Sequence, residues 1–409
     1  MSKKINVLVI PSDRSGVSKF RSVDPHIKLE QLYPDDFHVD IDYKANIDDE
    51  NFLKKYDIIH FHRTFGPYEQ MERRMGQLRK LGIKTIMDLD DYWRPTMDHP
   101  AYQLIMNEQL DKKIVNNLLY PDYVMTTTPI FADVISKYNK NVVVMPNAID
   151  HTERQFIPEN NEKQTDRVRV AWLGGSSHLA DLQILTTTIN KLHGDGYDKK
   201  TQFVVCGFDV RGEVTEYNPQ TQERKKRKIL PHETVWVKYE EIFTDNYKIL
   251  NDEKYLKYLQ EYINEPYDDL DQPYRRIWTK PVTTYAKNYN NFDISLAPLK
   301  EHTFNQVKSQ LKVIEAGFHK KALIAQNYGP YTIDLKHAYV NGEFVKGGNA
   351  LLVDSIKNHK QWHKYIKLLV DNPSLVVDLS EQLYEDVMPK YNLEKVTRDR
   401  AEFYKSIVN

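Results

Sequence analysis

Short runs of β-branched and other apolar residues alternate with helix-like stretches along nearly the whole chain, and this alternation constrains the fold more than any other feature. In the first part of the sequence the strand-like runs are Ile5–Ile10, Phe37–Ile41, 57–61, 84–87, Tyr123–Thr126 and 142–145. Several of the segments between them carry the apolar spacing of amphipathic helices. Such alternation predicts a parallel, doubly wound sheet with helices on its faces.

The alternation stops once and then starts again, which predicts a second domain of the same kind. The polar segment 150–166 breaks the pattern, and Val168–Leu173 resumes it. Further strands are expected at 203–206, 293–296, 322–325 and Leu351–Val353. The 409 residues are also many for one core, because domains usually run to about 100–200 residues. We therefore expect an α/β protein with two Rossmann-like, doubly wound domains.

The expected domains are an N-terminal one at 1–160 and a C-terminal one at 161–390. The last segment, 391–409, is expected to form a helix that packs back on the N-terminal domain. Residues 210–281 are long for a connection and rich in Tyr, Lys, Glu and Asp, so we interpret them as an insertion. Their basic run 223–228 is typical of phosphate or nucleic-acid contacts, but a solvated helix face or a loop is the simpler explanation.

The charge balance argues against nucleic acid or an acidic membrane as the main partner. Lys and Arg number 57 and Asp and Glu number 58, so any such binding needs a local patch. No apolar stretch approaches the ~20 residues that cross a bilayer, and the N-terminal pattern is too short for a signal peptide. We expect a cytoplasmic protein, with peripheral membrane contact left open. The single cysteine, Cys206, lies in an apolar run and is expected to be buried.

A glycine-containing loop after the first strand of the second domain is the strongest local signal for a ligand. Gly174 and Gly175 are followed by Ser176, Ser177 and His178, and then by a predicted helix. Glycines let a ligand approach the backbone closely, and free amides at a helix start favour a diphosphate. A plain tight turn with a serine cap would give the same pattern.

A second signal lies at the predicted helix 310–318 and just before it. Lys308, Lys312 and Glu315 are spaced i, i+4 and i+7, so we expect them on one helix face, with Ser309 beside them. The two ammonium groups would hold phosphate oxygens, and the carboxylate would accept hydrogen bonds from a ribose diol. An exposed helix with a Lys312–Glu315 pair is the alternative.

Loops after the first-domain strands supply candidates for the acceptor side, because ligands bind at the carboxyl ends of such strands. The candidates are Arg14, Gly16 and Arg21 after the first strand, His62 and Arg63 after the third, and Asp90 and Asp91 after the fourth. Asp90 and His62, with Lys308 from the second domain, are the candidate catalytic groups. The triplet Asp88-Leu89-Asp90 would also suit a divalent cation, but we expect an acceptor contact or a cap there and no metal.

The order of these motifs resembles the GT-B glycosyltransferases, in particular the "glycosyl transferases group 1" set of family 4-like retaining enzymes. In the second half the resemblance rests on 290–299, Lys308, Ser309, 315–317, 322–326, 329–331 and 348–353. In the first half it rests on Gly16, 88–91, 126–129 and 146–150. It covers nearly the whole chain apart from 210–281.

The resemblance implies two domains facing a cleft and a reaction that moves a sugar from a nucleotide-diphosphate sugar to a saccharide or lipid-linked acceptor. It also implies retention at the anomeric carbon and no cofactor or metal; relatives usually serve surface polysaccharide or glycolipid biosynthesis. It matches Glu315 to the ribose-binding member of the family's glutamate pair, and Gly174 and Gly175 to the loop near the donor phosphates. The other glutamate of the pair would fall at Val307, and His178 stands where a basic residue usually follows the loop.

Three other functions fit the same residues. A GT-B-fold sugar-nucleotide epimerase would need no acceptor, and a non-catalytic sugar-nucleotide-binding protein would be compatible with Val307. A nucleic-acid-binding protein would use the run 223–228. We expect the transferase, with a nucleotide sugar and an acceptor as partners and no nucleic acid.

Overall fold

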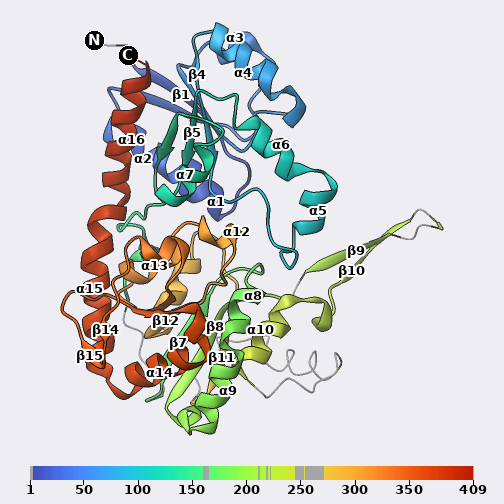
Figure 1. Cartoon of the computed structure of the whole chain (residues 1–409). Helices are drawn as coiled ribbons and strands as arrows, with labels where there is room; N and C mark the ends of the chain where they lie inside the picture. The colour runs from blue at the N-terminus through green and yellow to red at the C-terminus, as the bar shows by residue number, and fades with distance from the viewer. Residues whose placement is uncertain are drawn as a thin grey trace.

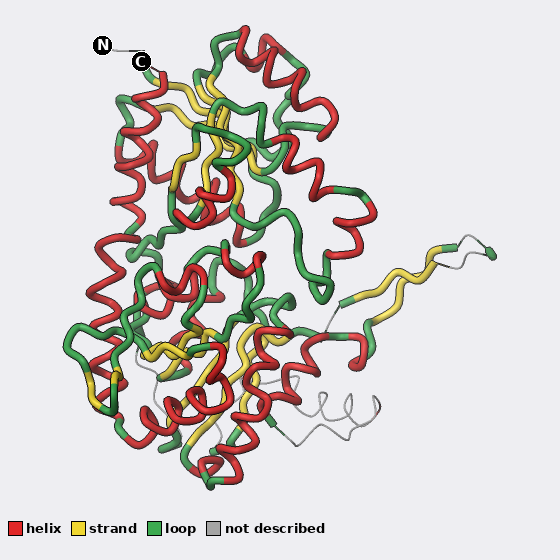
Figure 2. The backbone as a smooth tube through the Cα atoms, viewed as in Figure 1, coloured by secondary structure: helices red, strands yellow, loops and turns green. Residues whose placement is uncertain are grey.

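The chain forms two lobes, one above the other in Figure 1, and each lobe has a parallel sheet at its centre with helices around it (Figure 2). This computed structural model describes residues 3–159, 165–210, 212–217, 220–221, 223–244, 253 and 271–408. Two six-stranded sheets lie in two successive stretches of the chain. The predicted α/β architecture with two Rossmann-like domains is confirmed.

The N-terminal sheet has the order β2-β1-β3-β4-β5-β6, and every strand pair in it is parallel. Its strands are β1 Ile5–Ile10, β2 Phe37–Ile41, β3 Ile58–His62, β4 Lys84–Leu89, β5 Tyr123–Thr126 and β6 Val142–Val144. The order reverses at β1 and β3, so the loops after these two strands open a crevice at the carboxyl edge of the sheet.

The helices of this lobe connect successive strands over the two faces of the sheet. They are α1 Gly16–Ser18, the π-helix η1 Lys19–Val23, α2 Asp24–Leu32, α3 Glu50–Leu53, η2 Tyr68–Gln70, α4 Met71–Lys80, α5 Tyr102–Asn107, α6 Leu110–Asn117 and α7 Pro129–Ile135. α5 and α6 are separate helices, since Gln109 between them has a left-handed backbone with φ of 51°. The short 3-10 turn η3 Arg154–Phe156 follows in the crossing to the second lobe.

The C-terminal sheet has the order β11-β8-β7-β12-β13-β16, again with parallel pairs throughout. Its strands are β7 Val168–Leu173, β8 Thr201–Phe208, β11 Tyr274–Trp278, β12 Ile294–Ala297, β13 Ala322–Gln326 and β16 Leu351–Val353. The order reverses at β7 and β12, and ligands of such sheets bind at the loops after the strands where the order reverses.

Helices again cover both faces of this sheet. They are α8 Leu179–Leu182, η4 Gln183–Leu185, α9 Thr186–Gly194, η5 Tyr197–Lys199, η6 Pro231–Glu233, α10 Val235–Phe243, η7 Tyr285–Asn291, α12 Thr303–Gln306, α13 Leu311–Phe318, η8 Gly329–Thr332, η9 Ser355–Lys357, α14 Asn358–Asp371 and α15 Pro373–Tyr391. A short hairpin, β14 Tyr339–Val340 and β15 Glu343–Phe344, precedes β16. Cys206 in β8 is fully buried, as expected.

Part of the segment 210–281 belongs to the second domain's core, which corrects its interpretation as an insertion. β11 is the edge strand beside β8, and α10 packs near both. Arg276 Nε of β11 donates to Glu240 Oε1 of α10 over 2.7 Å, and both side chains are buried. β11 was not predicted because its sequence contains two arginines, which are unusual in a buried strand. Arg276 can be buried only because Glu240, 36 residues away in the sequence, pairs with it. Residues 245–252 and 254–270 of the segment lie outside the described residues.

The basic run 223–228 forms a strand, so its interpretation as a helix face or loop is wrong. β9 Glu213–Tyr217 and β10 Arg224–Lys228 pair as an antiparallel hairpin that extends away from the C-terminal lobe (Figure 1; Figure 2). Arg227 forms ion pairs with Glu216 and Glu233, and Lys226 lies 3.7 Å from Glu213. Part of the positive charge of this run is therefore balanced by neighbouring carboxylates.

The last helix, α16 Leu393–Val408, crosses from the second lobe to the first and packs on α2. Leu393, Val396, Ala401, Tyr404 and Ile407 join the apolar cluster under β1. The Tyr404 hydroxyl lies 2.8 Å from His26 Nε2, and Lys405 Nζ lies 2.5 Å from Asp36. The C-terminal helix thus contributes to the core of the N-terminal lobe.

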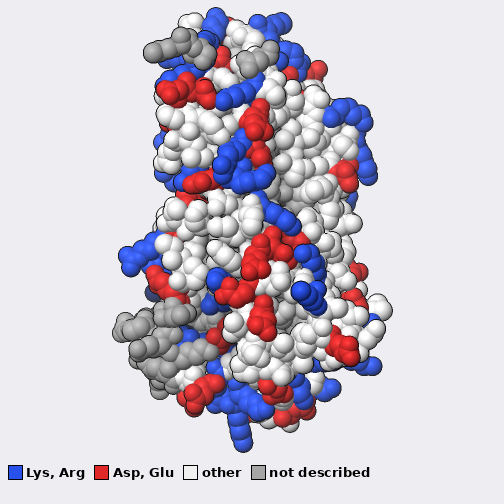
Figure 3. Space-filling view, turned by 90° about the vertical axis from the view of Figure 1, so that its left-hand side faces the viewer, with Lys and Arg blue, Asp and Glu red and all other residues white. Residues whose placement is uncertain are grey.

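Charges of both signs are interspersed over the side of the molecule that carries α15 and α16 (Figure 3). This agrees with the near-zero net charge of −1. Within the described residues, no helix has the length and apolar character needed to cross a membrane.

Arg21 is buried, so the structure corrects its prediction as an acceptor contact. Its guanidinium bonds both carboxylate oxygens of Asp88 on β4 at 2.9 and 3.0 Å, and Asp88 also lies 3.2 Å from His60 Nε2. Burial alone would raise the pKa of Asp88, but Arg21 and His60 hold that pKa well below its ordinary value. A further nitrogen, Arg21 Nη1, donates to Met145 O over 2.5 Å. The arginine therefore ties η1, β4 and the crossing segment together.

Replacing Arg21 with Ala should lower the free energy of unfolding by about 3–5 kcal/mol, because Asp88 would remain buried without its main counter-charge. Urea denaturation followed by circular dichroism measures the change. Arg14→Ala is the matched control: Arg14 is exposed and stacks on Tyr43, so its loss should cost no more than about 1 kcal/mol. Equal stability of the two variants would contradict a structural role for Arg21.

Candidate functional site

A pocket of about 620 Å³ opens at the cleft between the lobes. The N-terminal lobe lines it with the chain that follows β4, and the C-terminal lobe lines it with residues that follow β7 and β12. The lining residues are Arg94, Pro95, Thr96, Met97, Asp98, Tyr102, Ala180, Gln183, Lys300 and His302. The carboxyl ends of the central strands of both sheets thus meet at one cleft.

The two lobes are in direct contact at the inner end of this cleft. Val307 of the C-terminal lobe is fully buried in the apolar cluster of the N-terminal lobe, and Phe20 of the N-terminal lobe is buried in a cluster of the C-terminal lobe. Asn147 Nδ2 donates to the Ser309 hydroxyl over 3.1 Å. The position that the resemblance assigns to a glutamate therefore holds an apolar contact between the lobes.

Lys308 occupies the loop between α12 and α13, which corrects its expected place on the helix face with Lys312 and Glu315. Its ammonium group lies 5.0 Å from the ring centre of Phe304. Besides burial, the charge of Lys308 influences the pKa values of groups on both lobes, namely Asp91, His99, His178, Asp181 and His302. This lysine is therefore a cationic centre shared by the two walls of the cleft.

The two glycines of the loop after β7 differ in their surroundings: Gly174 packs against a side chain, and Gly175 has open space around it. A Cβ atom on Gly174 would lie 2.4 Å from the Trp172 ring, whereas one on Gly175 would meet nothing within 4 Å. Gly175 and Ser176 are exposed and Ser177 is half-buried. The Tyr239 hydroxyl holds the loop by donating to Gly175 O over 3.1 Å and accepting from the His178 amide over 2.8 Å. Gly175 and the two serines therefore form the accessible part of the loop.

His178 is a neutral imidazole with a fixed orientation. Its Nδ1 lies 2.8 Å from Asp181, which is buried and also accepts from the Lys300 amide and the Asn305 side chain. Burial and the charge of Lys308 lower the pKa of His178 to about 4. Because Nδ1–H donates to the carboxylate, Nε2 carries the lone pair. His178 therefore supplies a hydrogen-bond acceptor near the glycine loop rather than a positive charge.

Lys312 and Glu315 lie at the same end of the sheet as the glycine loop, not on an exposed helix face. Lys312 Nζ donates to Leu173 O and sits 5.1 Å from the Trp172 ring centre. Burial, with the charge of Lys308, lowers the pKa of Lys312 to about 8 despite the opposing effect of Glu315. Lys312 therefore brings a titratable cation to the base of the glycine loop.

Glu315 is buried and anchored by two tyrosines that no motif had indicated. Tyr285 donates to one carboxylate oxygen, and Tyr289 donates to the other over 3.0 Å. Burial raises the pKa of Glu315. A carboxylate offers about four lone-pair positions, so Glu315 retains accepting capacity for a ligand hydroxyl. Both tyrosines come from η7.

On the N-terminal lobe, His62, Arg63, Asp90 and Asp91 form one charged cluster at the ends of β3 and β4. His62 Nε2 lies 2.9 Å from Asp90, and Arg63 Nη2 lies 3.6 Å from Asp90 and 3.9 Å from Asp91. Burial opposes ionisation of Asp90, but His62 and Arg63 lower its pKa to about 2. Burial and the charge of Asp90 raise the pKa of Asp91. Asp91 is therefore the stronger base of the two carboxylates.

Two further features of this wall concern backbone geometry and metal binding. Arg63 has a positive φ of 61°, a strained conformation that turns the chain sharply at the end of β3. A Cβ on Gly16 would lie 4.0 Å from Val282 of the other lobe, whereas Arg14 stacks on Tyr43. Asp88 faces inward to Arg21, so the triplet does not present its two carboxylates together. Within the described ranges, no group of three His, Cys, Asp or Glu side chains is placed to hold a metal ion.

No family model and no curated protein match the sequence. Solved structures match the fold over the whole chain. Sucrose-phosphate synthase from Thermosynechococcus elongatus is 13% identical with a TM-score of 0.61, and the match covers 99% of each chain. HepE from Anabaena in complex with UDP and glucose is 10% identical with a TM-score of 0.57, covering 98% of this chain and 99% of that one. The catalytic domain of starch synthase IV from Arabidopsis thaliana is 9% identical with a TM-score of 0.56, covering 99% and 100%.

The chain has the GT-B fold. The C-terminal lobe carries the glycine loop, His178, Lys308, Lys312 and Glu315 in the segments that follow β7 and β12. The N-terminal lobe carries His62, Arg63, Asp90 and Asp91 at the ends of β3 and β4. Of the sequence-predicted residues, Arg21 is buried against Asp88, and Arg14 is exposed and stacks on Tyr43.

Sequence analysis did not single out four polar side chains that hold the candidate residues in place. Asp181 orients His178 and accepts from Asn305, and Tyr285 and Tyr289 anchor Glu315. Asp181 stands three residues after His178 at the start of a helix, and this spacing was a usable signal. The tyrosines had none, because their partner is 26 to 30 residues away in the sequence.

Gly174→Ala should destabilise the protein by about 1–3 kcal/mol, because the new methyl group would overlap the buried Trp172 ring. Gly175→Ala, the matched control, should leave stability within about 0.5 kcal/mol. Chemical denaturation of both variants provides the measurement. Similar losses in the two would show that the loop glycines serve backbone conformation and not the contact with Trp172.

Proposed function

We propose that this protein is a glycosyltransferase that moves a sugar from a nucleotide-diphosphate sugar to a saccharide or lipid-linked acceptor. The observation that carries the proposal is the position of Lys308, which lies between α12 and α13, next to the buried contact that Val307 makes with the N-terminal lobe. A departing diphosphate needs positive charge at this kind of position. The GT-B fold and the UDP-bound HepE structure support the donor class.

The donor is assigned to the C-terminal lobe. The accessible backbone and hydroxyls of Gly175, Ser176 and Ser177 would receive the diphosphate, with Lys308 and Lys312 as counter-charges. Glu315 would accept a ribose hydroxyl, and His178 Nε2 would accept a hydroxyl of the donor. Because these groups already supply the needed charge and hydrogen bonds, we propose transfer without a metal ion.

The acceptor is assigned to the N-terminal wall, near the charged cluster of Arg63, Asp90 and Asp91. In the reaction, the acceptor oxygen forms a bond to the anomeric carbon while the bond from that carbon to the diphosphate oxygen breaks. The bonding electrons leave with the diphosphate. The acceptor's proton goes either to Asp91, whose raised pKa suits a base better than that of Asp90, or to the leaving phosphate. Transfer of this proton to the leaving phosphate is the route that is compatible with retention of configuration at the anomeric carbon.

A non-catalytic sugar-nucleotide-binding protein is the second candidate, because Val307 occupies the position that the resemblance gives to a glutamate. Such a protein would bind the donor and leave it intact. An epimerase would convert the donor without an acceptor, so analysis of donor and product distinguishes all three.

Screening nucleotide sugars by thermal shift should identify a donor, since a ligand that binds the native state raises the melting temperature. With that donor and an acceptor mixture, Lys308→Ala should reduce release of nucleoside diphosphate by at least about a hundredfold, as expected for loss of a transition-state charge. Lys320→Ala is the matched control, since Lys320 is an exposed surface lysine paired with Glu381. Undiminished turnover in Lys308→Ala, or a wild-type protein that binds the donor without consuming it, would refute the transferase.

Affinity for UDP should fall as the pH rises from 7 to 9. Lys312, with a pKa of about 8, is charged below that pH and neutral above it, whereas a phosphate is already fully ionised above its second pKa of about 6. The expected loss is roughly threefold to tenfold. Calorimetric titration at several pH values measures it. Lys312→Met, neutral throughout, should bind weakly and show no such decline; an unchanged decline in that variant would assign the effect to another group.

A further inference from the structure

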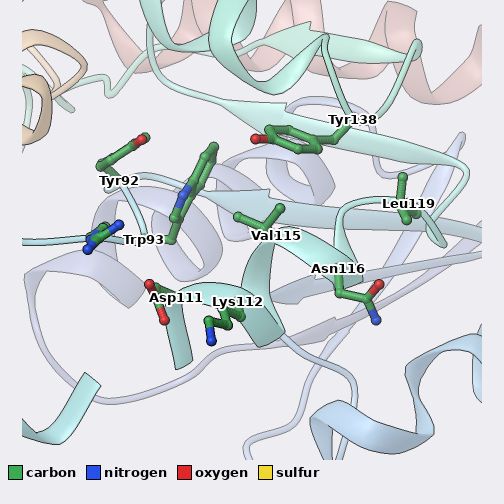
Figure 4. A pocket seen from close by; sticks show the side chains of 9 residues that line it. Tyr92, Trp93, Asp111, Lys112, Val115, Asn116, Leu119 and Tyr138 are labelled. Atoms are coloured by element: carbon green, nitrogen blue, oxygen red, sulfur yellow. The ribbon is translucent and has the colours of Figure 1, made fainter. Parts of the chain in front are cut away.

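A second pocket, of about 420 Å³, lies on the N-terminal lobe outside the cleft. It is an open hollow lined by the chain after β4, by α6 and by residues that follow α6 and α7 (Figure 4). The lining residues are Tyr92, Trp93, Arg94, Asp111, Lys112, Val115, Asn116, Leu119 and Tyr138.

Aromatic rings and polar side chains share the walls of this pocket. Tyr92 and Trp93 are neighbours with ring centres 4.4 Å apart, and Tyr138 stands edge-on to Trp93 at 5.7 Å. Polar residues of α6, namely Asp111, Lys112 and Asn116, line the side of the pocket opposite Trp93 and Tyr138 in Figure 4. Rings that combine an apolar face with a polar edge suit a ligand with C–H faces and a hydroxyl rim.

Asp111 provides an independent indication of a polar ligand. Its side chain is more than nine-tenths buried, and its Oδ1 atom is buried without a hydrogen-bond partner in the described part of the chain. A buried carboxylate oxygen without a donor costs free energy. A hydroxyl-rich ligand would supply that donor, whereas an acyl chain in the same place would leave the carboxylate unsatisfied.

The pocket is continuous in sequence with the candidate reaction centre. Asp90 and Asp91 stand at the cleft, and Trp93 follows within three residues, a span of at most about 11 Å from Asp90. Arg94 lines both this pocket and the 620 Å³ pocket between the lobes. A single ligand a few sugar units long can therefore reach from one site to the other.

We propose that this pocket is an acceptor subsite that binds a sugar unit of an oligosaccharide chain at a distance from the unit that is glycosylated. The acceptor is then an extended saccharide rather than a monosaccharide or a lipid tail. This rests on the proposed function for its role in transfer, but binding itself does not require the reaction.

The test is a printed array of oligosaccharides of increasing length, probed with the labelled full chain. At least one oligosaccharide should be retained, and its monosaccharide should be bound at least tenfold more weakly. Tyr138→Ala and Asp111→Asn should each reduce retention at least tenfold. Tyr138 lies at the exposed rim and its replacement spares the buried Trp93. Tyr384→Ala, which removes a tyrosine of the other lobe that contacts Lys320, is the matched control.

Four outcomes decide the proposal. Retention that depends on Tyr138 and Asp111 supports it. An array that retains nothing, or equal retention by the Tyr138→Ala variant, overturns it, as does tight binding of a fluorescent fatty acid in the same pocket. Nucleotide-sugar binding is measured on the same preparations by thermal shift and should be unchanged in both variants. If the wild-type protein binds the oligosaccharide but no nucleotide sugar, the transferase fails while the saccharide site stands.

Discussion

The parallel direction of every strand in the two sheets is the constraint on which the site depends. Parallel strands bring their carboxyl ends to one edge, and each lobe turns that edge toward the other. Residues 62, 90, 174 and 308, far apart in the sequence, thereby reach one cleft. Arg21 and Asp88 serve this arrangement indirectly, because their buried pair fixes η1 and β4 against the segment that crosses between the lobes. The chemistry of the cleft is thus supported by an ion pair that never faces a ligand.

Burial and neighbouring charges together set the protonation states of the site residues. His178 lies among cations and stays neutral, while Asp90 stays ionised because His62 and Arg63 surround it. Lys308 remains the cation that both walls share. Such an environment gives side chains of the same type different pKa values, and therefore different charges at one pH.

The pattern of apolar and polar residues was sufficient to predict most strands of the two sheets, but not the contacts of the site residues. β1, β2, β5, β7 and β16 have the predicted bounds because their apolar residues stop at polar or glycine-containing loops. β11 escaped detection because its buried Arg276 depends on Glu240, and Arg21 was misplaced because nothing local distinguishes a buried arginine from an exposed one. Lys308, Lys312 and Glu315 were predicted to share one helix face, which is wrong because α13 begins only at Leu311, after Lys308. Long-range partners decide such positions, and sequence spacing does not reveal them.

Val307 also has a consequence for how substrates reach the cleft. Separating the lobes would expose this fully buried side chain, and moving such an aliphatic group into water costs about 1.5–3 kcal/mol. From this contact alone the separated form would make up roughly 1–8% of free molecules. A donor that must enter through that minority would bind more weakly than its contacts allow, by the same fraction. The buried valine at this one point thus links entry of a substrate to the equilibrium between open and closed protein.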